Sequence, residues 1–561
     1  MSVAGDTFPT RPPRRRGERL SGWSLGAGAL AALVCLPVLA VLAIAAAPTG
    51  GIWQQLWSTV LPGYIGNTLA LMLLVGVGVA LTGTTTAWLT TMCQFPGRRL
   101  FEWALLLPLA FPAYVVAIVY VELLDYAGPL QGGLRALFGW QGPGAYWFPE
   151  IRSLGGAAAM LILVLYPYVY LLARTAFLDT SVSALEVART LGQGPWQAFR
   201  TVTLPLARPA IVIGVALALM EVLADFGTVQ IFAVETFTTG IYDVWLGFNN
   251  VRAAAQLAGL LLLFVLALIW IEWSSRRGRR FHNAGRHYRA LPRQPLRGGR
   301  AAAAVAACLA PLALGFLLPA AVLLAWAVRT FGDLRLGDYL SDLANTLGLG
   351  LATAALAVAV AMYLSYAMRL SHGRVLVAAA RLAASGYALP GPVIAVGVLL
   401  PFAWFDNMLI EWLRAHFGFT IGMLLSGTVV ALTFAYLVRF MALALGSVEA
   451  SLMRVTPNMD GAARTLGHGR WSILFRVHLP LIRGGALTAA LLVLVEVMKE
   501  LPATLILRPF NFSTLATRVF EFAADEQFEE TGLWALSIVA AGVVPVALLS
   551  LSIGRSRPGA G

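Results

Sequence analysis

The stretch Glu186-Val187-Ala188-Arg189-Thr190-Leu191-Gly192 decides the fold, because it returns as Gly461-Ala462-Ala463-Arg464-Thr465-Leu466-Gly467. Gly467 lies 275 residues after Gly192. A Leu-Pro-Leu triplet follows each copy, at residues 204–206 and 479–481, with the same separation. Self-similarity at a constant offset indicates an internal duplication.

Earlier landmarks keep nearly the same register. Asn67-Thr68-Leu69 returns as Asn345-Thr346-Leu347, and Phe111-Pro112-Ala113 returns as Leu389-Pro390-Gly391, both 278 residues later. Chance similarity between apolar helices does not hold register over such a distance. We therefore expect two tandem halves with the same orientation, a parallel repeat related by an axis along the membrane normal.

The composition predicts an all-α polytopic membrane protein. Of 561 residues, 59% are hydrophobic and 12% are charged, against about 25% charged in soluble domains. Windows that reach the roughly 20 apolar residues of a spanning helix occur about twelve times, for example over Trp23 to Ala47, Asn67 to Thr90, Gly156 to Leu178 and Ala253 to Trp273. The first window is too long for a signal peptide, so we interpret it as a retained span.

Basic residues predict the topology. The formal charge is +13, and the arginines cluster in alternate loops, which places those loops in the cytosol. An even number of spans then puts both termini in the cytoplasm. The arginine-rich segment 274–300 is interpreted as a cytosolic linker, because its place between two spans argues against nucleic-acid binding. The lipid bilayer is the expected surrounding.

The predicted organisation divides the chain at the linker. An N-terminal arm and first span come first, followed by a permease domain, the linker, a seventh span with its outer loop, a second permease domain and a tail. The corresponding ranges are 1–60, 61–273, 274–300, 301–338, 339–553 and 554–561.

The repeated loop predicts two short helices joined at a glycine. Ser183 and Glu186 fit a capping box, and Gly192 suits a left-handed C-terminal cap. A second helix is expected from Pro195 to a point before Pro205, with Trp196 exposed. In the second copy, Asn458 is expected at the cap, Gly467 at the joint and Trp471 on the surface. Exposed aromatic residues favour a partner surface, although a helix that rests on lipid headgroups is the alternative.

Glu186-Val187-Ala188 with Gly192 and the later Leu204-Pro205 resembles the EAA loop of ABC importer permeases with the MetI-like, type I fold. The resemblance implies that each loop docks on an ATPase subunit, present in two copies. The second copy departs from the pattern, since Gly461 stands where Glu186 stands in the first. The residues expected to contact or couple to the ATPase are Glu186, Ala188, Gly192, Trp196, Pro205, Gly461, Ala463, Gly467, Trp471 and Pro480.

No catalytic residues are predicted. The chain's single lysine, Lys499, precedes Glu500 instead of the Ser or Thr of a phosphate loop, so ATP must be hydrolysed on a separate subunit. Three cysteines and six histidines show no metal-ligand spacing. We expect no cofactor bound by this chain and no metal beyond transient contacts in a transport pathway.

A repeated acidic pair marks the expected pathway. Glu221 and Asp225 in the first half correspond to Glu496 and Glu500 in the second. A spacing of four residues puts each pair on one helix face, and two related halves would bring all four carboxylates towards one axis. Carboxylates suit a hard cation. The structural alternative is that Glu496 pairs with Lys499 while Asp225 or Glu500 reaches outside water.

The stretches 221–228, 236–242, 499–504 and 508–512 resemble fused ferric iron permeases. This resemblance implies Fe(III) import across the bacterial inner membrane, with delivery by an extracytoplasmic substrate-binding protein. Fused thiamine permeases share the architecture, so thiamine or another small solute is the alternative cargo. A secondary transporter that uses the four carboxylates as a coupling-ion site is the alternative of a different class.

Overall fold

A computed structural model describes residues 22–46, 51–178, 190–192, 194–276, 293–370, 374–453 and 455–555. Within these ranges the chain is almost entirely helical, and twelve helices are long and apolar enough to cross a membrane. The all-α, twelve-span prediction is confirmed. The two strands, β1 (Cys93–Gln94) and β2 (Gln294–Pro295), form one short parallel pair.

Each half is built around a three-helix bundle. In the first half α3, α7 and α10 pack together, and in the second half α16, α19 and α22 do the same. The first-half elements are α1 (Gly22–Ala45), α2 (Ile52–Thr59), α3 (Leu61–Met92), α4 (Arg98–Ala104), η1 (Leu107–Ala110), α5 (Ala113–Leu124), α6 (Pro129–Phe138), η2 (Pro143–Ala145), α7 (Leu154–Leu178), α9 (Pro195–Ala198), η3 (Phe199–Thr203), α10 (Leu204–Ala224), α11 (Gly227–Ile231), α12 (Phe237–Tyr242), η4 (Asp243–Gly247) and α13 (Val251–Arg276).

The second half follows the same order. Its elements are α14 (Gly299–Leu312), η5 (Ala313–Leu317), α15 (Leu318–Thr330), η6 (Phe331–Asp333), α16 (Leu336–Leu370), α17 (Arg374–Ala383), η7 (Ala384–Ala388), α18 (Gly391–Phe417), α19 (Val429–Leu452), α20 (Pro457–Thr465), α21 (Arg470–Ile473), η8 (Leu474–His478), α22 (Leu479–Lys499), α23 (Pro502–Leu507), α24 (Leu515–Ala524), η9 (Phe528–Glu530) and α25 (Thr531–Arg555).

The duplication extends to individual hydrogen bonds. The Asn67 side chain donates to the Glu235 carbonyl at 2.9 Å, and Asn345 donates to the Ser513 carbonyl at 3.0 Å. Helices α12 and α24 both begin with a Thr-x-x-Thr capping box. Equal local contacts at equal offsets make the two halves structural copies.

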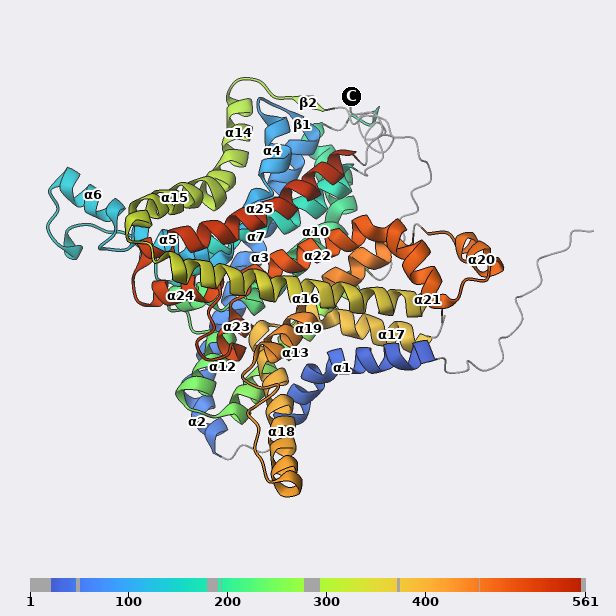
Figure 1. The fold of residues 1–561 in the computed structure, drawn as a ribbon. Helices are drawn as coiled ribbons and strands as arrows, with labels where there is room; N and C mark the ends of the chain where they lie inside the picture. The colour runs from blue at the N-terminus through green and yellow to red at the C-terminus, as the bar shows by residue number, and fades with distance from the viewer. Residues whose placement is uncertain are drawn as a thin grey trace, which may run out of the picture.

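The first and seventh spans each reach across to the other half. Helix α1 packs against α16, α17 and α18 of the second half as well as α13 of its own, while α14 and α15 contact α3, α4 and α5 of the first half and α15 also packs against α25. In Figure 1 the blue α1 accordingly lies beside the yellow α17. Trp23 and Ala27 join the second-half core, and Cys308 joins the first-half core. The two halves therefore interlock as one body.

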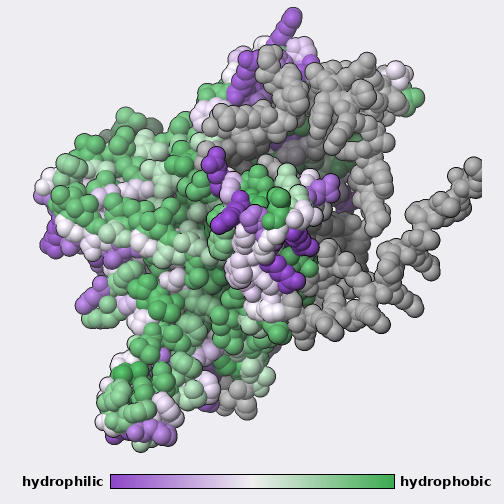
Figure 2. Space-filling model, turned by 45° about the vertical axis from the view of Figure 1, so that its right-hand side comes forward, coloured by the Kyte–Doolittle hydropathy of each residue, from purple (hydrophilic) through white to green (hydrophobic). Residues whose placement is uncertain are grey.

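Apolar side chains dominate the body of the molecule. Figure 2 shows a broad hydrophobic surface on this face, with hydrophilic residues gathered towards its ends. Long helices that stay apolar on their outward faces require a lipid environment, because water would penalise the exposure of so much apolar surface. This chain is a multi-pass membrane protein.

Two breaks in the helices position the centre of the molecule. The chain passes from η1 into α5 at Pro112 and from η7 into α18 at Pro390, both in extended conformation with ψ of 139° and 142°. A proline without a backbone N–H fits the start of a helix, where that donor has no partner. The matching prolines 112 and 390 therefore stand directly before the third and ninth spans, at equivalent points.

Candidate functional site

The second glycine joint is a complete C-terminal cap. Gly467 has a φ of +80°, its N–H donates to the Arg464 carbonyl at 3.0 Å, and the His468 N–H donates to the Ala463 carbonyl at 3.0 Å. This pair of bonds is the Schellman arrangement. The helix before it begins with Pro457, so Thr456 and not Asn458 is the N-cap; proline takes the first helical position and moves the boundary by two residues.

The described part of the first glycine joint resembles the second. Gly192 has a φ of +76° and is exposed, like Leu191. Glu186 and Ala188 lie outside the described residues, so their predicted role stays a prediction. Trp196 and Trp471 are 59% and 54% exposed. Both halves thus present a tryptophan just beyond a left-handed glycine.

The second short helix does not stop before the proline, contrary to the sequence prediction. α9, η3 and α10 form one continuous helix, as do α21, η8 and α22, and each η segment is a π-helical turn. The Leu204 N–H accordingly donates to the Phe199 carbonyl five residues back. A proline ring collides with the carbonyl four residues earlier, and the wider turn ahead of Pro205 and Pro480 accommodates it.

Four predicted pathway carboxylates line one cavity between the halves. Glu221, Asp225, Glu496 and Glu500 surround a volume of about 120 Å³, which is a few times the roughly 30 Å³ that a water molecule occupies in the liquid. The break before α5 reaches the same place, because Leu109 and Pro112 also line it. The break before α18 comes near it through Tyr387, whose hydroxyl donates to Glu221. The structure therefore brings the repeated acidic pairs together.

Two of the four carboxylates cap helices. Asp225 accepts hydrogen bonds from Thr228 Oγ1 at 2.8 Å and from the Val229 N–H at 3.1 Å. Glu500 accepts from the Ala503 and Thr504 N–H groups, each at 3.0 Å. Both therefore satisfy the first turns of α11 and α23, where backbone donors have no helical partner. The Glu500 side chain is 1% exposed, so it does not reach outside water as the structural alternative proposed.

The other two carboxylates have side-chain partners. Glu496 pairs with Lys499 at 3.2 Å, as the structural alternative expected, and Lys499 also donates to the Leu109 carbonyl across the half boundary at 3.2 Å. Glu221 accepts from the Tyr387 hydroxyl of the second half at 2.9 Å. These contacts bridge the two halves at the cavity.

The cavity is acidic even after its cations are counted. Arg439, which pairs with Glu500 at 3.3 Å, and Lys499 are the basic residues that line it. Four carboxylates against two cations leave a formal charge of −2 when all are ionised. Among the described residues, however, no group of three His, Cys, Asp or Glu side chains is arranged to hold a metal ion. The four carboxylates therefore line one cavity, and within the described part of the chain they are not arranged as a metal site.

Sequence reasoning missed three residues at this cavity. Tyr168, Tyr387 and Arg439 all contribute to its wall or to its hydrogen bonds. Arg439 stands in the middle of an apolar span, and an ionisable residue there is by itself a sign of function. The two tyrosines carry no such signal, because a tyrosine in a span is ordinary.

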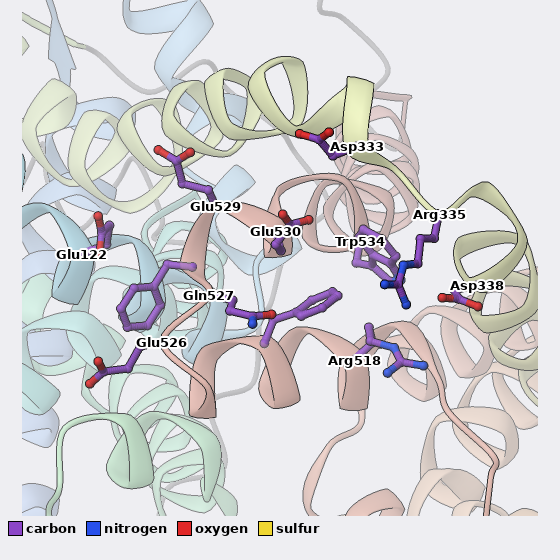
Figure 3. A pocket seen from close by; sticks show the side chains of 12 residues that line it. Glu122, Asp333, Arg335, Asp338, Arg518, Glu526, Gln527, Glu529, Glu530 and Trp534 are labelled. Carbon is purple, nitrogen blue, oxygen red and sulfur yellow. The ribbon is translucent and has the colours of Figure 1, made fainter.

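A second, larger cavity of about 690 Å³ lies at the end of the molecule away from the glycine joints. Figure 3 shows carboxylates from several elements around it, including Glu122, Asp333 and Glu530, with Arg335 and Arg518 at one side. Its lining has six acidic and two basic residues. The acidic end of the last loop was visible in the sequence, whereas the contribution of Glu122 was not.

Comparisons with known proteins agree with this architecture. Residues 83–280 match the family described as "Binding-protein-dependent transport system inner membrane component". The Fe(3+)-transport system permease protein FbpB 2 of Haemophilus influenzae is 26% identical over 492 residues, covering 86% of this chain and 89% of that protein. The similarity therefore extends through both halves.

Shorter relatives match about half of the chain. The molybdenum transport system permease protein ModB of Escherichia coli K12 is 30% identical over 237 residues, which is 41% of this chain but 97% of ModB. The sulfate transport system permease protein CysT of the same organism is 29% identical over 277 residues, 46% of this chain and 95% of CysT. One such permease is thus about as long as one half here, and the chain belongs to the inner membrane components of binding-protein-dependent ABC importers as a fused, two-domain permease.

Proposed function

We propose that this permease imports a cation, ferric iron, delivered by an extracytoplasmic binding protein. Two copies of a separate ABC ATPase dock at the two glycine joints and supply the energy, and the chain itself binds no cofactor. The observation that carries the choice of cargo is the acidic cavity, where four carboxylates face two cations.

Charge separates the candidate cargoes. The names of two relatives specify molybdenum and sulfate. Sulfate and molybdate, the oxyanion of molybdenum, are anions, and a cavity with a formal charge of −2 opposes their entry. A cation is attracted by the same field, and carboxylates are the preferred ligands of hard cations. The acidic lining at the far end of the molecule supports the same sign of charge. The extensive similarity to an Fe(3+) permease supports iron among the cations.

The breaks before α5 and α18 support a transport pathway at this cavity. Transporters place their substrate sites near the membrane midplane, where discontinuous helices expose backbone groups. Here the break before α5 offers the Leu109 carbonyl, and the break before α18 lies beside Tyr387. Opening of the halves would separate the Lys499 and Tyr387 bonds and widen the cavity for a cation.

The orientation follows from the loops. The arginine-rich loops lie on the side of the glycine joints, and excess basic residues mark the cytoplasmic side. We therefore place both joints and both termini in the cytoplasm, and the acidic end of the molecule outside.

Reconstitution tests the cargo and the energy source together. Proteoliposomes are prepared with the permease in the membrane, the ATPase and ATP in the lumen, and the binding protein outside. They should accumulate labelled Fe(III) and should not accumulate labelled thiamine, molybdate or sulfate. Iron uptake without ATP would instead identify an ion-coupled secondary transporter. Accumulation of thiamine or an oxyanion alone would overturn the assignment of iron.

A further inference from the structure

Asp460 connects the second glycine joint to the membrane helices. It lies in α20, one residue before Gly461, and its carboxylate accepts from Arg369 Nε at 2.8 Å and contacts His478 Nε2 at 2.6 Å. Arg369 belongs to α16 and His478 to the π-helical turn before α22. One side chain therefore joins α20 to the π-helical turn that follows it and to α16, which lies 91 residues earlier at Arg369.

The contacts around Asp460 are largely closed to water. The His478 side chain is 0% exposed, Asp460 14% and Arg369 19%. Tyr366 packs edge-on against the His478 ring and donates its hydroxyl to the Arg470 carbonyl at 2.8 Å. Helix α21, beyond the joint, is thus held to α16 as well. Charge-assisted hydrogen bonds in such a site are the strong ones.

The carboxylate is held in its charged form. Burial by itself raises the pKa of Asp460, but the hydrogen bonds from His478 and Arg369 more than compensate, so the pKa falls below its ordinary value. Asp460 is therefore ionised at neutral pH, and the ion pair with Arg369 is intact.

The first half has no equivalent of this cluster. The positions that match Asp460, Arg369, His478 and Tyr366 at the two offsets are Leu185, Thr91, Thr203 and Trp88. There the joint is held by aromatic packing, since Trp88 lies 6.1 Å from Trp196 and 5.3 Å from Phe199 between ring centroids. The duplicated loops are therefore attached to their bundles by different chemistry.

We propose that Asp460 is the positioning residue that couples the second joint to transport, by transmitting motion of α20 to α16 and α22 through Arg369 and His478. The inference rests on the proposed docking of an ATPase at this joint. It explains the second copy's departure at Gly461: the acid of this copy stands one residue earlier and faces inward, where it links the loop to the spans.

Two buried nitrogen atoms indicate that the link can rearrange. Among the described residues, His478 Nδ1 and Arg369 Nη2 are buried without a hydrogen-bond partner. A buried unpaired donor or acceptor is costly. Movement of α20 that admits water or a new partner to these atoms would remove that cost, so the cluster is not locked in this arrangement.

The test uses the complete complex in proteoliposomes, with Asp460→Asn as the variant. The asparagine keeps the shape and removes the charge. Co-purification of the ATPase should match that of the unaltered protein. The stimulation of ATP hydrolysis by iron-loaded binding protein should be at least about fivefold smaller in the variant than in the unaltered complex. Fivefold is the lower end of the usual coupling factors between two sites. Asp460→Glu, which restores the charge, should recover part of the stimulation.

Glu449→Gln is the matched control. Glu449 pairs with Arg381 at 2.9 Å on the same side of the molecule, but this pair joins α19 to α17 and does not touch α20. Its stimulation should equal that of the unaltered complex. Arg369→Gln should reproduce the loss, and it also removes the bond from Arg369 to the Leu452 carbonyl at 3.2 Å. The double variant with Asp460→Asn should therefore be no worse than Arg369→Gln alone, because both changes break the pair between Asp460 and Arg369.

Three results would overturn the inference. Asp460→Asn could retain full stimulation, it could fail to co-purify the ATPase, which would make Asp460 a direct contact, or Glu449→Gln could show the same loss. If Asp460→Asn does not accumulate, Arg369→Gln is judged by the same criteria. Failure of the proposed function itself looks different: the unaltered complex would then show no stimulation by any iron-loaded binding protein.

Discussion

Single residues divide the four cavity carboxylates into two kinds. Glu500 and Asp225 are committed to backbone donors at the starts of α23 and α11, whereas Glu221 and Glu496 are bonded to side chains that can turn away. A carboxylate whose partners are mobile is available to a passing cation. The first kind should therefore matter to stability and the second kind to transport.

Replacement of Glu500 by Gln should destabilise the protein. It leaves Arg439 buried without its anion, and removal of one partner of a buried ion pair costs about 3–5 kcal/mol in the free energy of unfolding. The midpoint of thermal unfolding in detergent checks this. An unchanged midpoint would mean that Arg439 finds another partner or water.

Replacement of Glu221 by Gln should leave stability nearly unchanged and reduce iron transport. The amide oxygen still accepts from Tyr387, while the formal charge of the cavity rises from −2 to −1. A loss of about 1.4 kcal/mol of attraction would reduce the rate roughly tenfold. The initial rate of labelled iron uptake is the measurement, with normal uptake as the contradicting result. Glu496→Gln should impair uptake too, but it also releases Lys499.

Gly467 should not tolerate a β-branched residue. A Cβ at this position meets nothing within 4 Å, so Gly467→Val acts only through the left-handed backbone, at about 1–2 kcal/mol. We expect inserted spans but weakened coupling to the ATPase, measured as transport-linked hydrolysis. Gly446→Ala, a substitution inside helix α19 that also has open space around it, should preserve coupling.

At the scale of elements, the start of helix α18 lies close to the buried pair of Arg439 and Glu500. Gly391 starts that helix, and a Cβ there would come within 2.6 Å of Arg439 Nη1 and 2.9 Å of Glu500 Oε1. The first half tolerates Ala113 at the equivalent position. The absence of a side chain at Gly391 thus lets the helix start approach the Arg439–Glu500 pair closely.

Gly391→Ala should therefore lower stability by about 1–3 kcal/mol, the usual cost of overpacking. Gly446→Ala is the comparison, because a Cβ at that position of α19 meets nothing within 4 Å and alanine is favoured over glycine in a helix by about 1 kcal/mol. Opposite shifts of the thermal unfolding midpoint for the two variants are expected. Equal shifts would contradict the close approach.

The whole molecule is held together by spans that reach across to the other half. Because α1 packs on the second half and α14 on the first, covalent connection between the halves is not what keeps them associated. Cutting the chain within the predicted linker 274–300 should therefore leave the two halves associated.

Co-expression of residues 1–284 and 285–561 as separate chains should yield a complex that co-purifies in mild detergent. Removal of residues 1–50 from the first piece should abolish or strongly weaken that association, since it uncovers the faces of α16, α17 and α18. Separate purification of the two intact pieces would show that these contacts between the halves contribute little.

Much of this architecture was predictable from local signals. Hydropathy located the twelve spans, the constant offset revealed the duplication, and glycine with proline marked the joints. These features depend on a few neighbouring residues and on the lipid solvent, so they can be read along the chain. The continuous helices through Pro205 and Pro480 were mispredicted, because a π-helical turn has no composition of its own.

Residue order alone determined that this protein is a duplicated, twelve-span permease with a pair of carboxylates at the C-terminal end of the fifth span of each half. Only the tertiary structure decided against which half the first span of each half packs. It also decided that Asp225 and Glu500 cap helices, whereas Glu221 and Glu496 bond to side chains. The contacts of Asp460 with Arg369 and His478 likewise came from the tertiary structure alone. The physical reason is that apolar spans are interchangeable in hydropathy, whereas the partner of a buried charge is fixed by packing between segments far apart in the chain.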